Sequence, residues 1–181
     1  MRPSTETITL GGGCFWCIEA VYERVRGVTA VESGYTNGHV QAPTYAQVCE
    51  GGTGHAEVVR VSYDPAQITL REVLEIFFVV HDPTSLNRQG ADAGTQYRSG
   101  IYFENAEQER VAKEVIAEMA ASKTYQQPVV TEVLPLQNYS RAESYHQHYF
   151  ANNPDAGYCA FVVAPKVAKF RKTFADRVRP D

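Results

Sequence analysis

The sequence predicts an α+β domain in which helices cover a mixed β-sheet. Runs with the two-residue alternation of strands interleave with segments of helical periodicity, and some strand-like runs follow one another without a helix between them. The 181 residues, 44% of them hydrophobic, can enclose the core of one domain. We therefore expect a single domain over residues 1–181, with its core at about 7–160 and a helical tail at about 161–181.

The first half of the chain supplies three predicted strands and two helices. Thr7–Leu10 alternates like a strand and runs into three glycines, after which the residues from Cys14 suit a helix that ends at Gly27. Two more strand-like runs flank a long loop with glycine and proline, and a buried helix follows, closed by His81-Asp82-Pro83. The expected bounds are 28–35 and 57–64 for the strands, 36–55 for the loop and 70–80 for the helix.

The second half continues the alternation of strands and helices. One of its helices is clearly amphipathic, because Val111, Val115, Ile116 and Met119 fall on one side of it. The expected elements are a strand at 100–104, the amphipathic helix at 106–122, a strand at 128–136, a helix at 141–150 and a terminal helix at 166–177.

Charge and hydropathy exclude several classes of partner. The net charge is −4, and basic residues stay scattered until Lys166–Arg179, which we interpret as a solvated helix. No broad cationic face for nucleic acid or an anionic membrane is therefore expected. The longest apolar run, Leu74–Val80, contains Glu75 and is too short to span a bilayer. We expect a monomer that binds neither nucleic acid nor membranes.

Cysteine usage favours a reducing compartment. Four cysteines are too few for a disulfide scaffold in a chain of this size, and the N-terminal MRPSTETITLGG lacks the apolar core of a signal peptide. We therefore expect a cytoplasmic protein, in which Cys49 is structural.

The stretch LGGGCFWCIE at 10–19 carries the most chemical information. A thiol in the first turn of a helix meets the positive end of the helix dipole and unpaired N–H groups, which favour the thiolate, so Cys14 is a candidate nucleophile. Phe15 and Trp16 can form apolar walls beside it for a small group such as a methyl. The structural alternatives are a buried apolar cysteine and ordinary core packing of the two aromatic residues.

Cys17 completes a C-x-x-C pair, since residues three apart on a helix are neighbours. A thioredoxin-like redox pair also opens a helix after a strand, but a single C-x-x-C is a weak signal. A zinc site would need a second ligand pair, and Cys49, Cys159 and the five histidines show no such pattern. The pair thus stays open between a redox role and a structural one.

Strand parity singles out Glu57 as a candidate acid. It shares its face of the strand with Val59, Val61 and Tyr63, and a carboxyl in apolar surroundings has a raised pKa and can hold a proton near neutral pH. A strand-end glutamate that reaches solvent is the alternative. Tyr45, Tyr97 and Asp92 lie in turn-rich loops, but the residue pattern alone does not select them.

Several motifs together resemble the A-type peptide methionine-S-sulfoxide reductases. They occur in the order typical of that family and cover most of the chain, from Gly11 to about Cys159. The motifs are GCFW at 13–16, PTY at 43–45, GHAEVV at 54–59, HDPT at 81–84, GADAGTQYRS at 90–99 and GYC at 157–159.

The resemblance implies a fold and an activity. The fold would be a two-layer α/β sandwich of the ferredoxin-like plait type. The activity would be thiol-dependent reduction of methionine S-sulfoxide, free or in proteins, to methionine, which repairs proteins after oxidative stress. Carried over to this sequence, the Cys14 thiolate attacks the sulfoxide sulfur and Glu57 protonates the leaving oxygen. The other implied roles are oxygen binding by Tyr45 and Tyr97, methyl enclosure by Phe15 and Trp16, and an amide contact by Asp92.

The resemblance also implies how the enzyme is recycled. Cys14 would become a sulfenic acid, which a second cysteine converts to a disulfide that thioredoxin reduces. Cys159, in a glycine-bearing C-terminal segment, matches the resolving position, and we expect it to attack the sulfenic acid. Cys17 is the other candidate, either as a buried neighbour or as a thiol that accepts the disulfide afterwards. No metal or organic cofactor is needed. A general C-x-x-C dithiol oxidoreductase and a non-catalytic module that binds apolar side chains are the competing interpretations.

Overall fold

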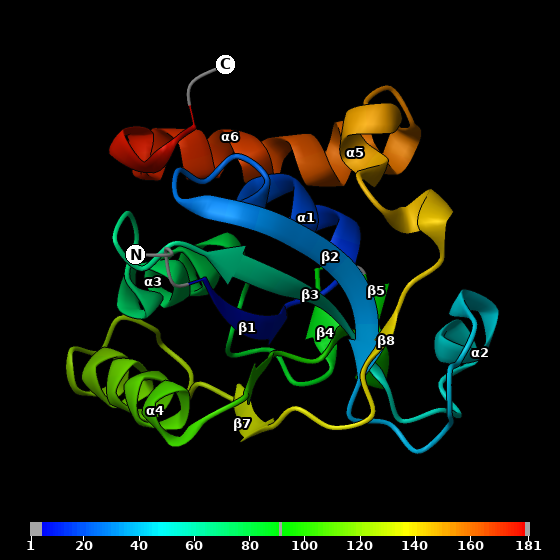
Figure 1. Ribbon diagram of the computed structural model, residues 1–181, viewed down its shortest axis with the longest axis horizontal. Helices are drawn as coiled ribbons and strands as arrows, with labels where there is room; N and C mark the ends of the chain where they lie inside the picture. The colour runs from blue at the N-terminus through cyan, green and yellow to red at the C-terminus, as the bar shows by residue number, and fades with distance from the viewer. Residues whose placement is uncertain (1–4, 91, 180–181) are drawn as a thin grey trace.

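A six-stranded mixed sheet forms the centre of the computed structural model, which describes residues 5–90 and 92–179 (Figure 1). The strand order is β7-β6-β1-β3-β2-β8, and all neighbours are antiparallel except β6 and β7. This sheet and its helices confirm the predicted α+β class. The strands are β1 (Glu6–Gly11), β2 (Val28–Thr36), β3 (Ala56–Tyr63), β6 (Gly100–Phe103), β7 (Glu132–Pro135) and β8 (Ser140–Arg141).

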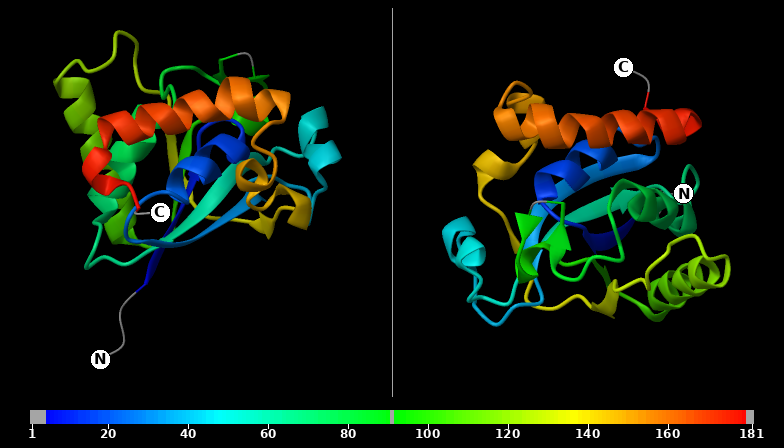
Figure 2. Two further views of the ribbon diagram at one scale, coloured as in Figure 1. Left: turned by 90° about the horizontal axis from the view of Figure 1, so that it is seen from above. Right: turned by 180° about the vertical axis from the view of Figure 1, so that it is seen from behind.

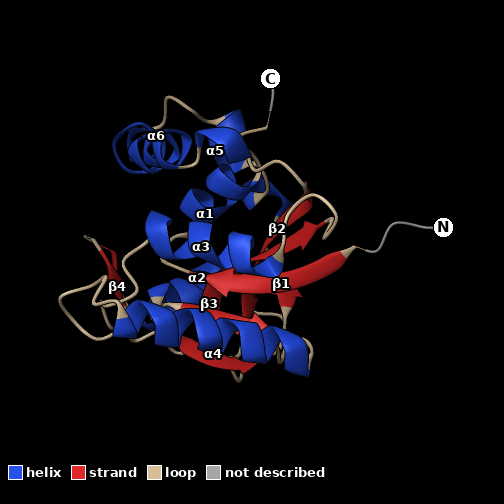
Figure 3. Cartoon of the chain, turned by 90° about the vertical axis from the view of Figure 1, so that its left-hand side faces the viewer, coloured by secondary structure: helices blue, strands red, loops and turns tan. Residues whose placement is uncertain are grey.

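The helices pack on this sheet and on one another. α1 packs on β2 and β3, α4 on β6 and β7, and α3 contacts both α1 and α4. α6 lies over α1 and α3, on the side of the molecule opposite α4 (Figures 1, 2 and 3). The helices are α1 (Phe15–Tyr22), α2 (Tyr45–Glu50), α3 (Leu70–Val80), α4 (Ala106–Ala121), α5 (Tyr149–Asn152) and α6 (Ala164–Thr173). A separate hairpin joins β4 (Arg88–Gln89) to β5 (Asp92–Ala93).

The core lies between the sheet and these helices. Alternate residues of β1 and β3 point into it, and helices α1 and α3 supply the opposing apolar side chains. Fully buried members include Ile8, Leu10, Val59, Val61, Val21, Leu74 and Phe77. Within residues 5–90 and 92–179, no helix combines the length and the apolar content that crossing a membrane requires.

Local capping explains why α3 has the bounds that its sequence predicts. Thr69 accepts a hydrogen bond from the Glu72 N–H, and the Glu72 side chain accepts one from the Thr69 N–H, a reciprocal capping box. The helix ends at Val80, and the next residue, His81, has an extended backbone before the Asp82-Pro83 pair. α2 begins with a similar box between Thr44 and Gln47, inside the region expected to be a loop.

The helix that starts after Cys14 ends at Tyr22, five residues before the predicted end at Gly27. The backbone between Tyr22 and Gly27 forms hydrogen bonds with the C-terminal segment instead. The Arg26 N–H donates to the Arg177 carbonyl at 2.7 Å, and the Arg179 N–H donates to the Arg24 carbonyl at 2.7 Å. These long-range bonds replace helical ones. Local periodicity contains no information on them.

The predicted helix at 141–150 is wrong. β8 occupies its start, a 3₁₀ turn follows at Ser144–His146, and α5 begins only at Tyr149. Gln147 is extended and His148 has a φ of +56°, so the chain cannot continue as one helix. The terminal helix differs less, since α6 ends at Thr173 and a 3₁₀ turn covers Ala175–Arg177. The single-domain organisation stays a prediction.

We predict that Gln147→Ala lowers the free energy of unfolding by about 2–4 kcal/mol, because it removes three hydrogen bonds to buried backbone groups. The Gln147 side chain accepts from the Ser33 N–H at 2.9 Å and donates to the carbonyls of Ser33 at 2.9 Å and Ala142 at 3.1 Å. Urea unfolding measures the change. Gln127→Ala, at an exposed position, is the control and should shift stability by less than about 0.5 kcal/mol. Equal midpoints for the two variants would contradict this role.

Candidate active site

The turn from β1 into α1 places Cys14 at the first turn of the helix. Gly13 has a φ of +93°, and a Cβ on it would lie 2.8 Å from the Gln89 side chain, so only glycine fits there. Cys14 follows as the N-cap residue with extended backbone, and its side chain forms no cap hydrogen bond. It is 6% exposed. The glycine turn therefore delivers a nearly buried thiol to the edge of the core.

The resting state of Cys14 differs from the one that the helix N-terminus predicts. Burial raises the pKa of the Cys14 thiol well above its ordinary value, and its hydrogen bond with Cys17 and the charge of Glu57 raise it further. The Trp16 backbone N–H lowers the pKa, but it does not compensate for burial. In the resting state, burial and these two neighbours thus oppose the preference for thiolate that the helix N-terminus predicts.

Cys17 is the thiol of the pair that ionises more readily. The hydrogen bond from Cys14 lowers the pKa of Cys17 to about 7 against the effect of burial, and the charge of Lys166 contributes. Cys17 is fully buried, with its Sγ 3.9 Å from the Tyr158 hydroxyl oxygen. The two thiols are therefore in contact, and Cys17, the one with the lower pKa, lies three residues farther along the chain, inside α1.

Glu57 lies where strand parity predicts, on the buried face of β3. It is 1% exposed, and the Phe15 N–H donates to its Oε1 at 3.1 Å. Its Oε2 is buried without a hydrogen-bond partner among the described residues. Burial raises the pKa of Glu57 to about 8, which makes it a neutral acid at neutral pH. One oxygen of this acid is thus fixed by the backbone of α1.

Tyr45 and Tyr97 are partly buried tyrosines within the electrostatic influence of Cys14 and Glu57. Tyr45 is the first residue of α2, and Tyr97 belongs to a 3₁₀ turn at Thr95–Tyr97. Burial raises the pKa of both phenols above the ordinary value, and the charges of Glu57 and Cys14 add to this. Both hydroxyls therefore keep their protons. The Tyr45 ring also lies near Phe15, with centroids 6.2 Å apart, and Phe15 is the residue whose N–H binds Glu57.

Glu143, which the sequence analysis did not identify, holds Tyr45 in place. Its Oε2 accepts from the Tyr45 N–H at 2.8 Å, and its Oε1 accepts from the Tyr35 hydroxyl at 2.8 Å. The contacts span about a hundred residues of sequence, so no local spacing signals them.

An aromatic cluster surrounds the first turn of α1. The Trp16 ring stacks on Tyr149 with centroids 3.8 Å apart and planes 6° apart, and its Nε1–H donates to His146 Nδ1 at 3.0 Å. Phe15 is buried, 5.0 Å from the His146 ring. His146 and Tyr149 come from the segment that was expected to be helical. Their roles were missed because that segment folds back on α1.

The structure brings Asp92 to the thiol pair and places Cys159 in a helical segment. Asp92 Oδ2 accepts from the Tyr158 hydroxyl at 2.5 Å, and this hydroxyl also contacts Cys17. Cys159 is fully buried and opens a π-helical turn at Cys159–Val163 that continues into α6. Burial raises the pKa of Cys159, and the charge of Cys17 adds to the shift. Cys159 thus lies in regular helical structure.

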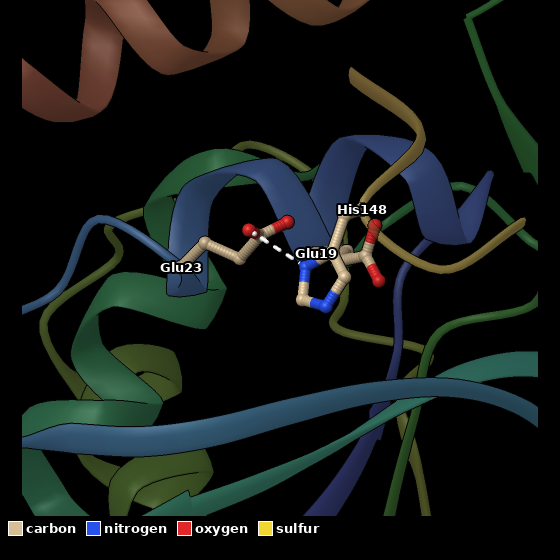
Figure 4. A group of neighbouring side chains, drawn as sticks. All are labelled: Glu19, Glu23 and His148. Atoms are coloured by element: carbon tan, nitrogen blue, oxygen red, sulfur yellow. Dashed lines mark hydrogen bonds and ion pairs between the residues drawn. The ribbon is translucent and has the colours of Figure 1, made fainter. Parts of the chain in front are cut away.

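One group of potential metal ligands lies close together in the described part of the chain: Glu19, Glu23 and His148, with ligand atoms within 4.8 Å of one another (Figure 4). Hydrogen bonds account for this cluster. Glu19 accepts from the Ser33 hydroxyl and from the Tyr149 N–H, both at 3.2 Å, and His148 Nδ1 lies 3.0 Å from Glu23 Oε2. We interpret the cluster as the clamp that fixes the 146–149 segment on α1.

Comparison with known proteins identifies the family. A family model described as peptide methionine sulfoxide reductase matches residues 6–178. The peptide methionine sulfoxide reductase MsrA of Polynucleobacter asymbioticus is 53% identical over 98% of this chain and 94% of its own. Reduced Mxr1 of Saccharomyces cerevisiae is 37% identical, with a TM-score of 0.78 over 86% of this chain and 89% of its own. A structure of Mxr1 in complex with Trx2 is 25% identical, with a TM-score of 0.55 over 82% and 89%. The chain belongs to the peptide methionine sulfoxide reductase family.

Proposed function

We propose that the protein reduces methionine S-sulfoxide to methionine with its own thiols, and that Cys14 is the nucleophile. The observation that carries this proposal is the buried neutral acid: Glu57, with a pKa of about 8 and one free oxygen, in the same cluster as the Cys14 thiol. Sulfoxide oxygen leaves poorly unless it is protonated, so the reaction needs such an acid beside the attacking sulfur.

In the first half of the reaction, oxygen moves from methionine to Cys14. The Cys14 sulfur bonds to the sulfoxide sulfur while Glu57 donates its proton to the oxygen, and the thiol proton of Cys14 restores the neutral form of Glu57. The hydroxyl group then passes to Cys14 as the bond between the two sulfurs breaks. Tyr45 and Tyr97, which keep their protons, donate hydrogen bonds to that oxygen as negative charge develops on it. Methionine gains two electrons and leaves, and Cys14 becomes a sulfenic acid.

The substrate is held by the walls of the same cluster. Phe15 and Trp16 enclose the methyl group, and Asp92 binds the substrate amide. The aromatic packing of Trp16 on Tyr149 supports this, since it fixes the indole plane beside Cys14. We also propose that the enzyme selects the S-epimer and that it is located in the cytoplasm. The small number of cysteines in the sequence supports the cytoplasmic location.

In the second half, a thiol attacks the sulfenic acid, water leaves and a disulfide forms. We propose Cys17 as the first attacking thiol, because it is hydrogen-bonded to Cys14 and has a pKa of about 7. Cys159 then accepts the disulfide by exchange, and direct attack by Cys159 is the alternative order. Thioredoxin reopens the final disulfide, and the Mxr1 complex with Trx2 supports this choice of reductant.

The acid role predicts that Glu57→Gln lowers kcat/KM for a methionine-sulfoxide peptide by about 10²- to 10³-fold, since an amide cannot donate the proton in the same way. Steady-state reduction with dithiothreitol measures it. Glu50→Gln, an exposed glutamate, is the matched control and should keep wild-type activity. A Glu57→Gln enzyme with wild-type single-turnover rates would refute the role of Glu57.

The same role predicts a pH limb. Because Glu57 must carry its proton to act and its pKa is raised to about 8, the single-turnover rate should fall as the pH rises through about 8. Rapid-quench measurements between pH 6 and 10 test this. In Glu57→Gln the residual rate should no longer fall as the pH rises through about 8. A decrease that persists in the variant would show that another group causes it.

The proposed relay predicts that Cys17→Ser slows disulfide formation after one turnover by at least about tenfold, because the thiol in contact with Cys14 is lost. The Cys14 sulfenic acid should then persist and react with dimedone, as peptide mass spectrometry would show. Cys49→Ser is the control. A Cys14–Cys159 bridge that forms as quickly in Cys17→Ser as in the wild type would make Cys159 the first resolving residue instead.

A further inference from the structure

A cavity of about 730 Å³ opens between the end of α3, the β4–β5 hairpin and the start of α6. The segment after α4 closes it on a further side, through Thr124 and Tyr125. None of the proposed steps of sulfoxide reduction uses most of this space. Its size suits one or two amino-acid side chains rather than a single methyl group.

The cavity adjoins the reacting thiols. Asp92 and Tyr158 line it, and their hydrogen bond forms the wall between it and Cys17. Gln89 also lines it, and the same side chain packs against Gly13, next to Cys14. A peptide whose sulfoxide side chain reached Cys14 and whose amide met Asp92 would therefore continue into the cavity.

One part of the lining is apolar and unusually exposed. Phe161 is 83% exposed at the rim of the cavity, beside Val162 and Pro165. It lies in the π-helical turn, and Pro165 has no N–H to offer the carbonyl of residue 161, which disfavours an ordinary α-helical turn there. A phenyl ring held in water gains stability when an apolar side chain covers it.

The other part of the lining is cationic. Lys166 and Lys169 are three residues apart on α6, so they lie on the same side of the helix, facing the cavity. Neither forms an ion pair with a carboxylate in the described residues. The two acidic lining residues have other partners: Asp82 accepts from Thr84 and Ser85, and Asp92 accepts from Tyr158. The ammonium groups remain available to a ligand.

We propose that this cavity binds the residues that flank methionine sulfoxide in a polypeptide substrate, and that it selects an apolar side chain together with an acidic one. The inference rests on the proposed function and narrows its substrate class from any methionine sulfoxide to peptides with such flanks. The apolar side chain covers Phe161, and the carboxylate pairs with Lys169 and Lys166.

The test compares kcat/KM for short peptides that contain one methionine S-sulfoxide. In the first peptide, phenylalanine and glutamate flank the methionine sulfoxide. In the second the flanking residues are phenylalanine and lysine, and in the third they are glycine and serine. Each pair is tested in both orders. N-acetyl methionine sulfoxide amide is the reference without flanks. In the proposed reaction the sulfoxide is reduced before the reductant reacts with the enzyme. The value of kcat/KM for the sulfoxide therefore does not depend on the reductant. We expect the first peptide to exceed the other two by about tenfold, as one favourable contact pair provides.

Variants assign the preference to the cavity. Lys169→Glu should reverse the preference between glutamate and lysine peptides, and Phe161→Ser should remove the advantage of phenylalanine, each as a ratio to the reference substrate. Lys172→Glu, an exposed lysine of α6 outside the lining, is the matched control and should leave the ratios unchanged.

Three outcomes would overturn the inference. Equal kcat/KM for all peptides, or equal effects of Lys169→Glu and Lys172→Glu, would show that the cavity does not recognise the flanking residues. Variants that slow only thioredoxin-supported turnover would assign the cavity to the reductant. Absence of reduction of every sulfoxide, the reference included, would instead reject the proposed function itself.

Discussion

The hydrogen bond from the Phe15 N–H to Glu57 is the contact on which the site depends. Cys14, the N-cap residue of α1, provides no side-chain cap, so a carboxyl from β3 takes that place. One bond therefore fixes the helix that carries both thiols relative to the strand that carries the acid. It also leaves the second oxygen of Glu57 without a hydrogen-bond partner among the described residues.

Burial then sets the protonation of every group around that bond. Removing Cys14, Glu57 and the two tyrosines from water raises the pKa of each, because each would ionise to an anion in a poorly solvated place. The resting site is therefore rich in protons and poor in negative charge, which suits a reaction that must protonate a leaving oxygen. Cys17 is the exception, since the hydrogen bond from Cys14 favours its thiolate.

Sequence reasoning was most reliable where the signal was local. The parity of β3 placed Glu57 on the buried face, and the closing His81-Asp82-Pro83 agreed with the end of α3 at Val80. It failed where distant segments exchange hydrogen bonds. Gln147 breaks the predicted helix at 141–150 by binding the backbone of β2, and no pattern in that segment signals a partner 114 residues away. The pKa of Cys14 was misjudged for a related reason: helix position is visible in the sequence, whereas the depth of burial is not.

The most direct test of this account is the protonation state of Glu57 in the reduced protein. Infrared difference spectroscopy across a pH titration can follow its carboxyl C=O band, and Glu57→Gln identifies the band by its loss. The account predicts a neutral carboxyl that persists through pH 7 and titrates near pH 8. A carboxylate that is already ionised at pH 6 would contradict it, because the site would then hold no acid for the sulfoxide oxygen.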